Sequence, residues 1–222
     1  MEGIIFLIYI VVFIGSVILH EIAHGYVANR FGDDTARVSG RLSLNPLVHI
    51  DPVGSVLVPL LLFVSNSGFL FGWAKPVPVN AYRLRGGAAA YRWVTLAGVA
   101  TNLVLAVIGI LILKLALQLM FLPVNNLGVF FFQVLFQVNL VLAVFNLIPL
   151  PGFDGFNFLT TFSPIGRLIA QTPLGNPLFM LRYGLVVSIL LLFLFMPYIG
   201  ALIQMIFNVF IRIFGLTWPR TF

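Results

Sequence analysis

The sequence predicts an all-α polytopic membrane protein with about five to six transmembrane helices, a re-entrant segment and short extended β segments near the cytoplasmic face. Two observations lead to this fold class. Of the 222 residues, 61% are hydrophobic and only 8% are charged, which is too little charge for the surface of a soluble domain of this length. Long runs without charged residues also recur along the chain, and a helix needs about 20 apolar residues to cross a bilayer.

Five apolar segments are long enough to cross the membrane. They are residues 3–29, 93–120, 127–149, 179–197 and 198–215. Prolines separate neighbouring segments, because proline removes a backbone donor and interrupts a helix. Pro123 lies between the second and third segments, and Pro197 lies between the last two.

The apolar stretch 52–72 differs from these five segments. Pro59 lies inside it and a turn signal, Ser65–Gly68, lies near its end. Basic residues precede and follow the stretch: Arg30, Arg37, Arg41, Lys75, Arg83, Arg85 and Arg92. If the positive-inside rule places all of them in the cytoplasm, the stretch enters and leaves on one face of the membrane. A true crossing at 52–72 is the alternative, and it would place the two basic clusters on opposite sides.

The net charge of +6 is explained by this topology. The basic residues are scattered between apolar runs, where cytoplasmic loops are expected, so the lipid bilayer and not nucleic acid is the expected partner. The protein is therefore expected to be a multi-pass protein of the cell membrane. The chain contains no cysteine, which excludes disulfides and thiolate metal ligands.

Two segments are expected to be extended. Residues 37–44 alternate polar and apolar side chains, which predicts a short strand. Residues 76–80 read Pro-Val-Pro-Val-Asn, and a residue before proline is pushed out of the helical region. Residues 1–222 are expected to form a single intramembrane domain, with a core at about 1–160 and C-terminal helices at about 179–215.

An HExxH motif, His20-Glu-Ile-Ala-His24, lies near the end of the first apolar segment. Residues four apart share a helix face, so both imidazoles can reach one ion. Zinc binds imidazole nitrogen and leaves a position for water in catalytic sites, and Glu21 can accept a proton from that water. Ionisable groups at membrane depth are costly and usually functional. The motif therefore predicts one Zn²⁺ per chain, with Glu21 as the catalytic base.

Asp154 is the expected third ligand. It follows a long apolar segment in Asn146-Leu-Ile-Pro-Leu-Pro-Gly-Phe-Asp154-Gly155. The prolines and Gly152 interrupt the helix, and irregular backbone at membrane depth is tolerated only within protein or beside a water-filled cavity. The predicted topology brings Asp154 to the same cytoplasmic side as His24. His49, in contrast, is expected to form hydrogen bonds near the interface and not to bind the metal.

These residues resemble the site-2 protease family of intramembrane zinc metalloproteases, in a compact prokaryotic form without PDZ or CBS (nucleotide-sensing) domains. The resemblance rests on His20–His24, Ser43–Gly54, Gly72–Asn80 and Asn146–Gly155. It implies that His20, His24 and Asp154 bind zinc, that Glu21 is the base, and that the substrates are transmembrane segments of other proteins. Family members often carry proline where this chain has Val99.

Two asparagines are expected to support the site. Asn102 lies on a face of small residues, so helix packing and a role towards the substrate are both open. Asn146 is expected to bond the loop that precedes Asp154.

Two other functions remain as alternatives. The first is a metal transporter or sensor, although no inverted repeat is visible. The second is an inactive scaffold that binds membrane helices. The sequence makes no prediction about the oligomeric state.

Overall fold

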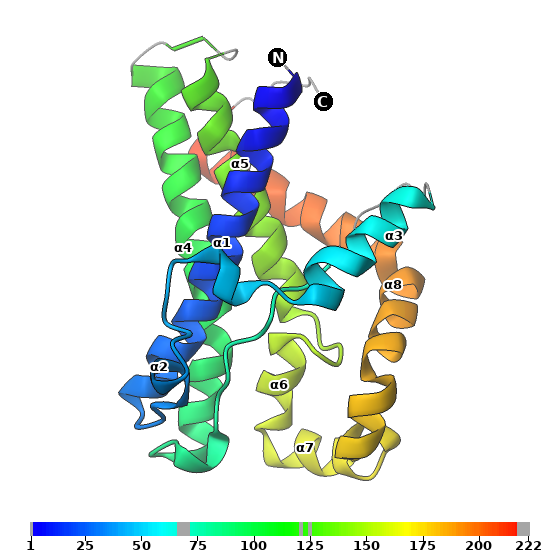
Figure 1. Cartoon of the computed structure of the whole chain (residues 1–222). Coiled ribbons are helices and arrows are strands. Elements are labelled where there is room, and N and C mark those ends of the chain that lie inside the picture. The colour runs from blue at the N-terminus through cyan, green and yellow to red at the C-terminus, as the bar shows by residue number, and fades with distance from the viewer. Residues whose placement is uncertain (1, 66–71, 120–121, 124–125, 217–222) are drawn as a thin grey trace. The chain divides into compact units, whose positions relative to one another are not determined.

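The computed structural model describes residues 2–65, 72–119, 122–123 and 126–216 (Figure 1). All regular elements in this part of the chain are helical. The longer helices are α1 (Glu2–Arg30), α4 (Gly87–Lys114), α5 (Leu127–Leu147) and α8 (Pro177–Phe214). The shorter α-helices are α2 (Thr35–Val38), α3 (Val58–Val64), α6 (Asp154–Thr160) and α7 (Ser163–Ala170). Short 3₁₀ or π segments are η1 (Pro46–His49), η2 (Pro52–Leu57), η3 (Ala81–Arg83), η4 (Leu115–Leu119) and η5 (Pro173–Gly175).

Four helices are long and apolar enough, by length and composition, to cross a membrane. Their apolar parts are Glu2–Arg30, Gly87–Gln118, Leu127–Leu147 and Arg182–Phe214. The first three correspond to the predicted segments 3–29, 93–120 and 127–149. The chain is therefore an all-α membrane protein, as the sequence predicts.

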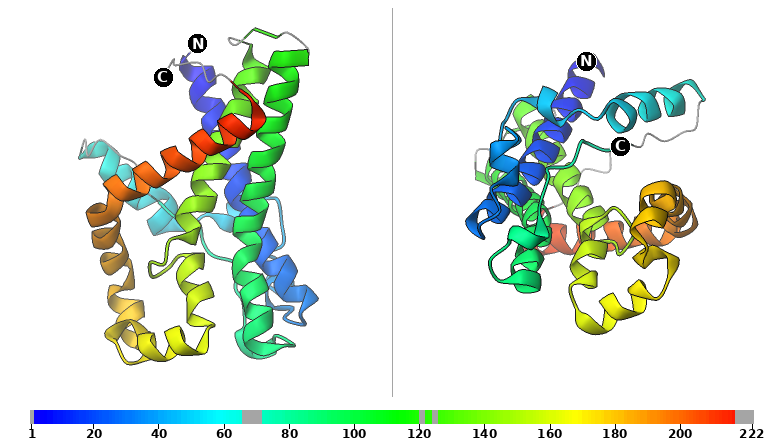
Figure 2. Two further views of the ribbon diagram at one scale, coloured as in Figure 1. Left: turned by 180° about the vertical axis from the view of Figure 1, so that it is seen from behind. Right: turned by 60° about the horizontal axis from the view of Figure 1, so that its bottom comes forward.

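The C-terminal part differs in detail from the prediction. The sequence predicts two segments, 179–197 and 198–215, but one helix, α8, runs through both with Pro197 inside it. Figure 2 shows that α8 changes direction along its length. Proline bends a helix because it removes one backbone hydrogen bond and crowds the preceding turn. The number of crossings that α8 makes stays a prediction.

The predicted strand at 37–44 is not found. Thr35–Val38 forms the helical turn α2, and the N–H of Arg41 donates to the carbonyl of Ala36. Alternation alone does not make a strand, because a strand also needs a neighbour to pair with. Among the described residues no strand occurs, and residues 76–80 contain no helix.

The described residues at the two ends of the stretch 52–72 lie next to each other. Its helical part consists of the six residues of η2 and the seven of α3, which rise about 20 Å at about 1.5 Å per residue, less than the bilayer core. The N–H of Trp73 donates to the carbonyl of Gly54 at 3.2 Å, and the hydroxyl of Ser55 donates to the carbonyl of Trp73 at 2.8 Å. These bonds bring Trp73 next to Gly54 and Ser55, and the re-entrant path of the stretch through a membrane stays a prediction. Most of the predicted turn at 65–68 lies outside the described residues.

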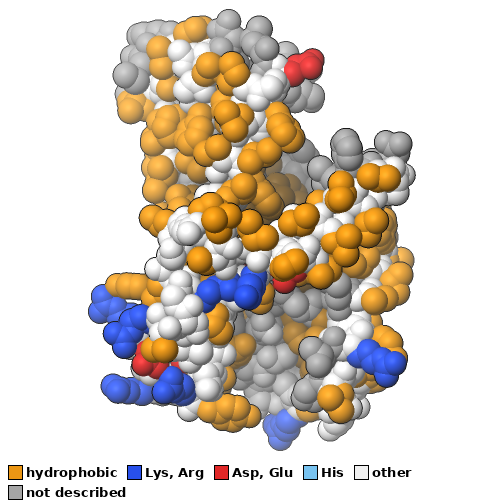
Figure 3. Space-filling model, in the orientation of Figure 1, with side chains coloured by type: hydrophobic (Ala, Val, Ile, Leu, Met, Phe, Trp, Pro, Cys, Tyr) orange, Lys and Arg blue, Asp and Glu red, His pale blue; other side chains and the backbone are white. Residues whose placement is uncertain are grey.

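The chain divides into two compact units, residues 17–98, and residues 1–16 with 99–222. In the first unit, a small core joins the end of α1 to the start of α4. Its buried members are Ala28, Leu84, Ala90 and Val94. Exposed Lys and Arg side chains gather over the segments beside α2 and the start of α4, whereas hydrophobic side chains cover α3 (Figure 3).

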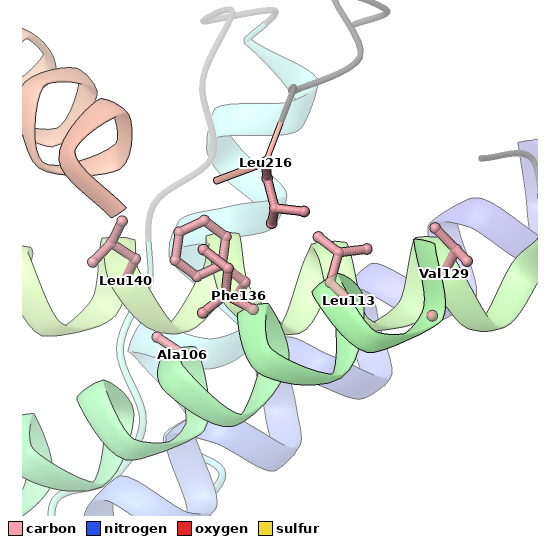
Figure 4. Close-up of a cluster of buried hydrophobic side chains, with 8 residues drawn as sticks. Ala106, Leu113, Val129, Phe136, Leu140 and Leu216 are labelled. Atoms are coloured by element: carbon pink, nitrogen blue, oxygen red, sulfur yellow. The ribbon is translucent and has the colours of Figure 1, made fainter. Parts of the chain in front are cut away.

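In the second unit, α4 and α5 pack against each other through a hydrophobic cluster (Figure 4). Its buried members are Ala106, Ile110, Leu113, Ala116, Val129, Phe136, Leu140 and Leu216. The two helices approach closely at Gly109, where a Cβ would lie 2.8 Å from the backbone nitrogen of Phe136. A small residue at this position permits the contact, as is typical of helix packing in membranes.

Candidate metal centre

His20 and His24 lie one turn apart on α1, and both are buried. Their rings meet edge to face with centroids 4.7 Å apart, and their Nε2 atoms are 3.0 Å apart. The local cause is the helical period, which places residues i and i+4 above one another. Two imidazole nitrogens are therefore directed to one small region, as metal binding requires.

The carbonyl oxygen of Val94 on α4 determines the tautomer of His24. It lies 2.7 Å from Nδ1 of His24. A carbonyl can only accept, so Nδ1 carries the proton and, in the neutral ring, Nε2 carries the lone pair. Metal-binding histidines usually donate their second ring N–H in this way, which fixes the ring orientation.

Gly98 keeps the region around the two Nε2 atoms open. A Cβ on Gly98 would lie 2.5 Å from Nε2 of His20 and 2.5 Å from Nε2 of His24. The backbone of α4 therefore passes directly beside the imidazole nitrogens, and a larger residue would occupy the volume next to them. The absence of a side chain at Gly98 and the fixed tautomer of His24 fit a metal ion that binds both nitrogens.

Glu21 follows His20 on α1 and is half-buried. Its Oε2 accepts a hydrogen bond of 2.8 Å from the backbone N–H of Val77. The carboxylate is thus oriented by a residue far away in the sequence. This contact fixes Oε2, whereas Oε1 takes no part in that hydrogen bond.

Asp154 is the first residue of α6, and the preceding loop determines its place. Gly152 adopts a positive φ of 89°, a conformation that glycine adopts without strain. A Cβ on Gly155 would lie 2.1 Å from the carbonyl oxygen of Leu147, so the chain folds back tightly on the end of α5. The hydroxyl of Ser188 on α8 donates to the carbonyl of Pro151. Both the sequence of the loop and its contact with α8 therefore position Asp154.

His20, His24 and Asp154 form a group that could hold a metal ion. Two imidazole nitrogens and one carboxylate oxygen suit zinc, and this number of ligands leaves a fourth coordination position for water. His49 is not part of the group. It is buried, and its Nε2 donates to the carbonyl of Ser43 at 2.8 Å, which agrees with the predicted hydrogen-bonding role.

The two predicted supporting asparagines make different contacts. The side-chain amide of Asn102 donates to Oδ1 of Asn139 at 2.8 Å, and the amide of Asn139 donates to the hydroxyl of Ser16 at 2.9 Å. All three side chains are buried, so they form a polar connection inside apolar helices. Asn146 donates to the carbonyl of Leu142 in its own helix, whereas the sequence predicts a bond to the following loop.

Three groups support the candidate metal centre but were not expected from the sequence: the N–H of Val77, Gly98 and Ser188. Gly98 stands in a run of small residues that suggests only helix packing. Ser188 is one hydroxyl in an apolar helix, which often bonds its own backbone, as Ser188 also does to Gly184. Of the three, only Val77 could have been noticed in the sequence, because Pro76 and Pro78 on either side of it have no backbone N–H to donate.

Comparison with known proteins gives several relatives. The chain is 39% identical over 185 residues to a Bacillus subtilis (strain 168) protein named "Putative zinc metalloprotease YwhC", which covers 82% of this chain and 78% of the relative. It is 35% identical over 157 residues to "Putative zinc metalloprotease Rip2" of Mycolicibacterium smegmatis, covering 70% of this chain and 57% of that protein. Rip2 of Mycobacterium tuberculosis H37Rv is 34% identical over 68% of this chain.

The matched region spans less than two thirds of the length of the mycobacterial relatives. No family model matches the chain, and no solved structure matches it.

Proposed function

Since the chain belongs to the site-2 protease family of zinc metalloproteases, we propose that it hydrolyses peptide bonds in or near transmembrane segments of other membrane proteins. The observation that carries the proposal is the pair of Nε2 atoms of His20 and His24, 3.0 Å apart beside Gly98. The four long apolar helices support a membrane location for the reaction.

Each residue of the site has a separate task in this proposal. His20, His24 and Asp154 would hold the zinc ion, and the carbonyl of Val94 keeps the ring of His24 in the required tautomer. A zinc ion held by these residues would supply a Lewis acid and would lower the pKa of a water molecule to near neutral. Glu21 would accept the proton of the water that attacks the peptide carbonyl and would then donate it to the leaving amine.

The basic residues favour a cytoplasmic orientation of this site. Arg30, Arg37, Arg83 and Arg85 are exposed in the unit that carries His20, Glu21 and His24. Positively charged segments remain on the cytoplasmic side of membranes. Water and a polar substrate segment would therefore reach Glu21 from that side.

Zinc content and cleavage test the proposal together. The purified wild type, reconstituted in vesicles, is expected to contain about one zinc per chain and to cut members of a panel of tagged single-span peptides. Asp154→Ala should lose zinc, whereas Glu21→Gln should retain zinc and lose cleavage. Asp34→Ala is the matched control, because this carboxylate forms a surface ion pair with Arg37 at 3.6 Å.

Two results would contradict the proposal. A folded, metal-replete wild type without zinc would favour a scaffold that binds membrane helices. Zinc that moves across the vesicle membrane, with equal rates in wild type and Glu21→Gln, would favour a transporter, because transport does not need Glu21 as a base.

A further inference from the structure

Arg41 is a buried cation without an acidic partner. Its side chain is 7% exposed, and it forms no ion pair with any residue that the structure describes. A buried charge is costly unless hydrogen bonds or an opposite charge compensate it. Its Nη2 donates to the carbonyl of Lys75 at 2.5 Å and to the carbonyl of Pro76 at 3.3 Å.

The peptide that accepts from Arg41 is the same peptide that donates to Glu21. The carbonyl oxygen of Pro76 faces the guanidinium, and the N–H of Val77, across the same peptide bond, donates to Oε2 of Glu21 at 2.8 Å. The negative end of the peptide dipole thus meets the cation, and the positive end meets the carboxylate. Hydrogen bonds connected in this way polarise and strengthen one another in a low-dielectric environment.

The prolines make this arrangement specific. Pro76 and Pro78 have no N–H, so Val77 supplies the only backbone donor between them. Proline 78 also restricts Val77 to an extended backbone, and the ring of Pro76 fixes its own φ. The segment therefore presents one donor in one direction, and Val77 itself is buried.

Further bonds fix the two ends of the connection. The N–H of Lys75 donates to the carbonyl of His49 at 2.9 Å, and the N–H of Arg41 donates to the carbonyl of Ala36 at 2.9 Å. The backbones of Arg41 and Lys75 are thus held by neighbouring backbone within residues 17–98.

We propose that Arg41 is a positioning residue for Glu21 and acts through the Pro76–Val77 peptide. Arg41 polarises the peptide, the N–H of Val77 binds Oε2, and the carboxylate of Glu21 is thereby held in one orientation. The assignment of Glu21 as the base rests on the proposed function. The hydrogen-bonded connection itself does not, so the two can be tested separately.

Amide hydrogen exchange at Val77, followed by NMR on valine-labelled protein, tests the connection without any substrate. The Val77 N–H should be protected in the wild type, and its exchange should become faster in Arg41→Gln and in Glu21→Ala. Arg41→Lys, which keeps a cation near the carbonyls, should retain part of the protection. Arg37→Gln is the control, because Arg37 is an exposed arginine whose side chain is 65% accessible.

Kinetics test the consequence for catalysis. Arg41→Gln should lower kcat about 10- to 100-fold, as misplacement of a reacting group does. Its KM and zinc content should stay close to the wild type, and Arg41→Lys should recover part of the kcat.

Unchanged amide exchange at Val77 in both Arg41→Gln and Glu21→Ala would overturn the connection. Faster exchange with unchanged kcat would overturn the positioning role. If the two variants exchange faster at Val77 but the wild type cleaves no substrate, only the proposed function is rejected.

Discussion

Gly98 on α4 lies so close to His20 on α1 that a Cβ on the glycine would come within 2.5 Å of Nε2 of the imidazole. The absence of a side chain at one residue therefore creates the volume in which the two histidine nitrogens meet. The close packing of α1 and α4 at this glycine therefore affects the position where the imidazoles would bind a metal.

Gly98→Ala is expected to reduce zinc content strongly, because the new methyl group would occupy the volume beside both Nε2 atoms. Metal analysis of the purified variant measures this, with circular dichroism to verify that the helices form. Gly15→Ala is the control, since nothing lies within 4 Å of the position that its Cβ would take. Normal zinc content in Gly98→Ala would show that the ion binds elsewhere.

Ser188→Ala is expected to weaken zinc binding about tenfold or more, the usual range for residues that support ligands. The hydroxyl of Ser188 donates to the carbonyl of Pro151, in the loop that leads to Asp154. Competition with a zinc chelator measures the affinity. Ser188→Thr retains a hydroxyl and should bind zinc more tightly than the alanine variant; equal affinities in both would reject the role of this hydrogen bond.

Asp33 is expected to stabilise residues 17–98 in a pH-dependent way. Burial by itself raises the pKa of Asp33, but hydrogen bonds from Thr35 and from the N–H of Asn80, with the charge of Arg83, lower this pKa overall. A lowered folded-state pKa means that the stabilisation is present above the unfolded pKa of about 3.9. It is lost as the pH falls through the folded-state value.

Asp33→Asn should therefore destabilise the protein by about 1.5–3 kcal/mol at pH 7, the range for a hydrogen bond to a charged group. The difference from the wild type should shrink as the pH falls below about 4. Thermal unfolding in detergent measures both values. If wild type and Asp33→Asn differ in stability by the same amount at pH 7 and pH 3, the charge of Asp33 contributes nothing to stability.

If residues 52–72 re-enter the membrane, as the sequence predicts, the residues before and after them are accessible from the same side. The chain has no cysteine, so single substitutions provide clean labels. Ser43→Cys and Tyr82→Cys should both react with an impermeant thiol reagent from the cytoplasmic side in oriented vesicles; Tyr82 is fully exposed. Labelling from opposite sides would establish a true crossing.

Much of the fold follows from local patterns. The apolar runs identify α1, α4 and α5, because length and hydropathy alone decide whether a helix can cross a bilayer. Proline 197 was expected to end a helix, but α8 continues through it. A proline removes only one internal hydrogen bond, and neighbouring helix turns and side chains compensate for it in membranes.

The residues of the candidate site were likewise predictable only in part. The sequence by itself determined the pair His20 and His24, because a spacing of four residues encodes proximity on a helix, and it indicated Asp154 through the helix break before it. Only the tertiary structure decided that Gly98 lies beside the imidazoles and that the N–H of Val77 binds Glu21. Such contacts join residues distant in the chain, and their distances depend on how whole helices pack, which no local pattern specifies.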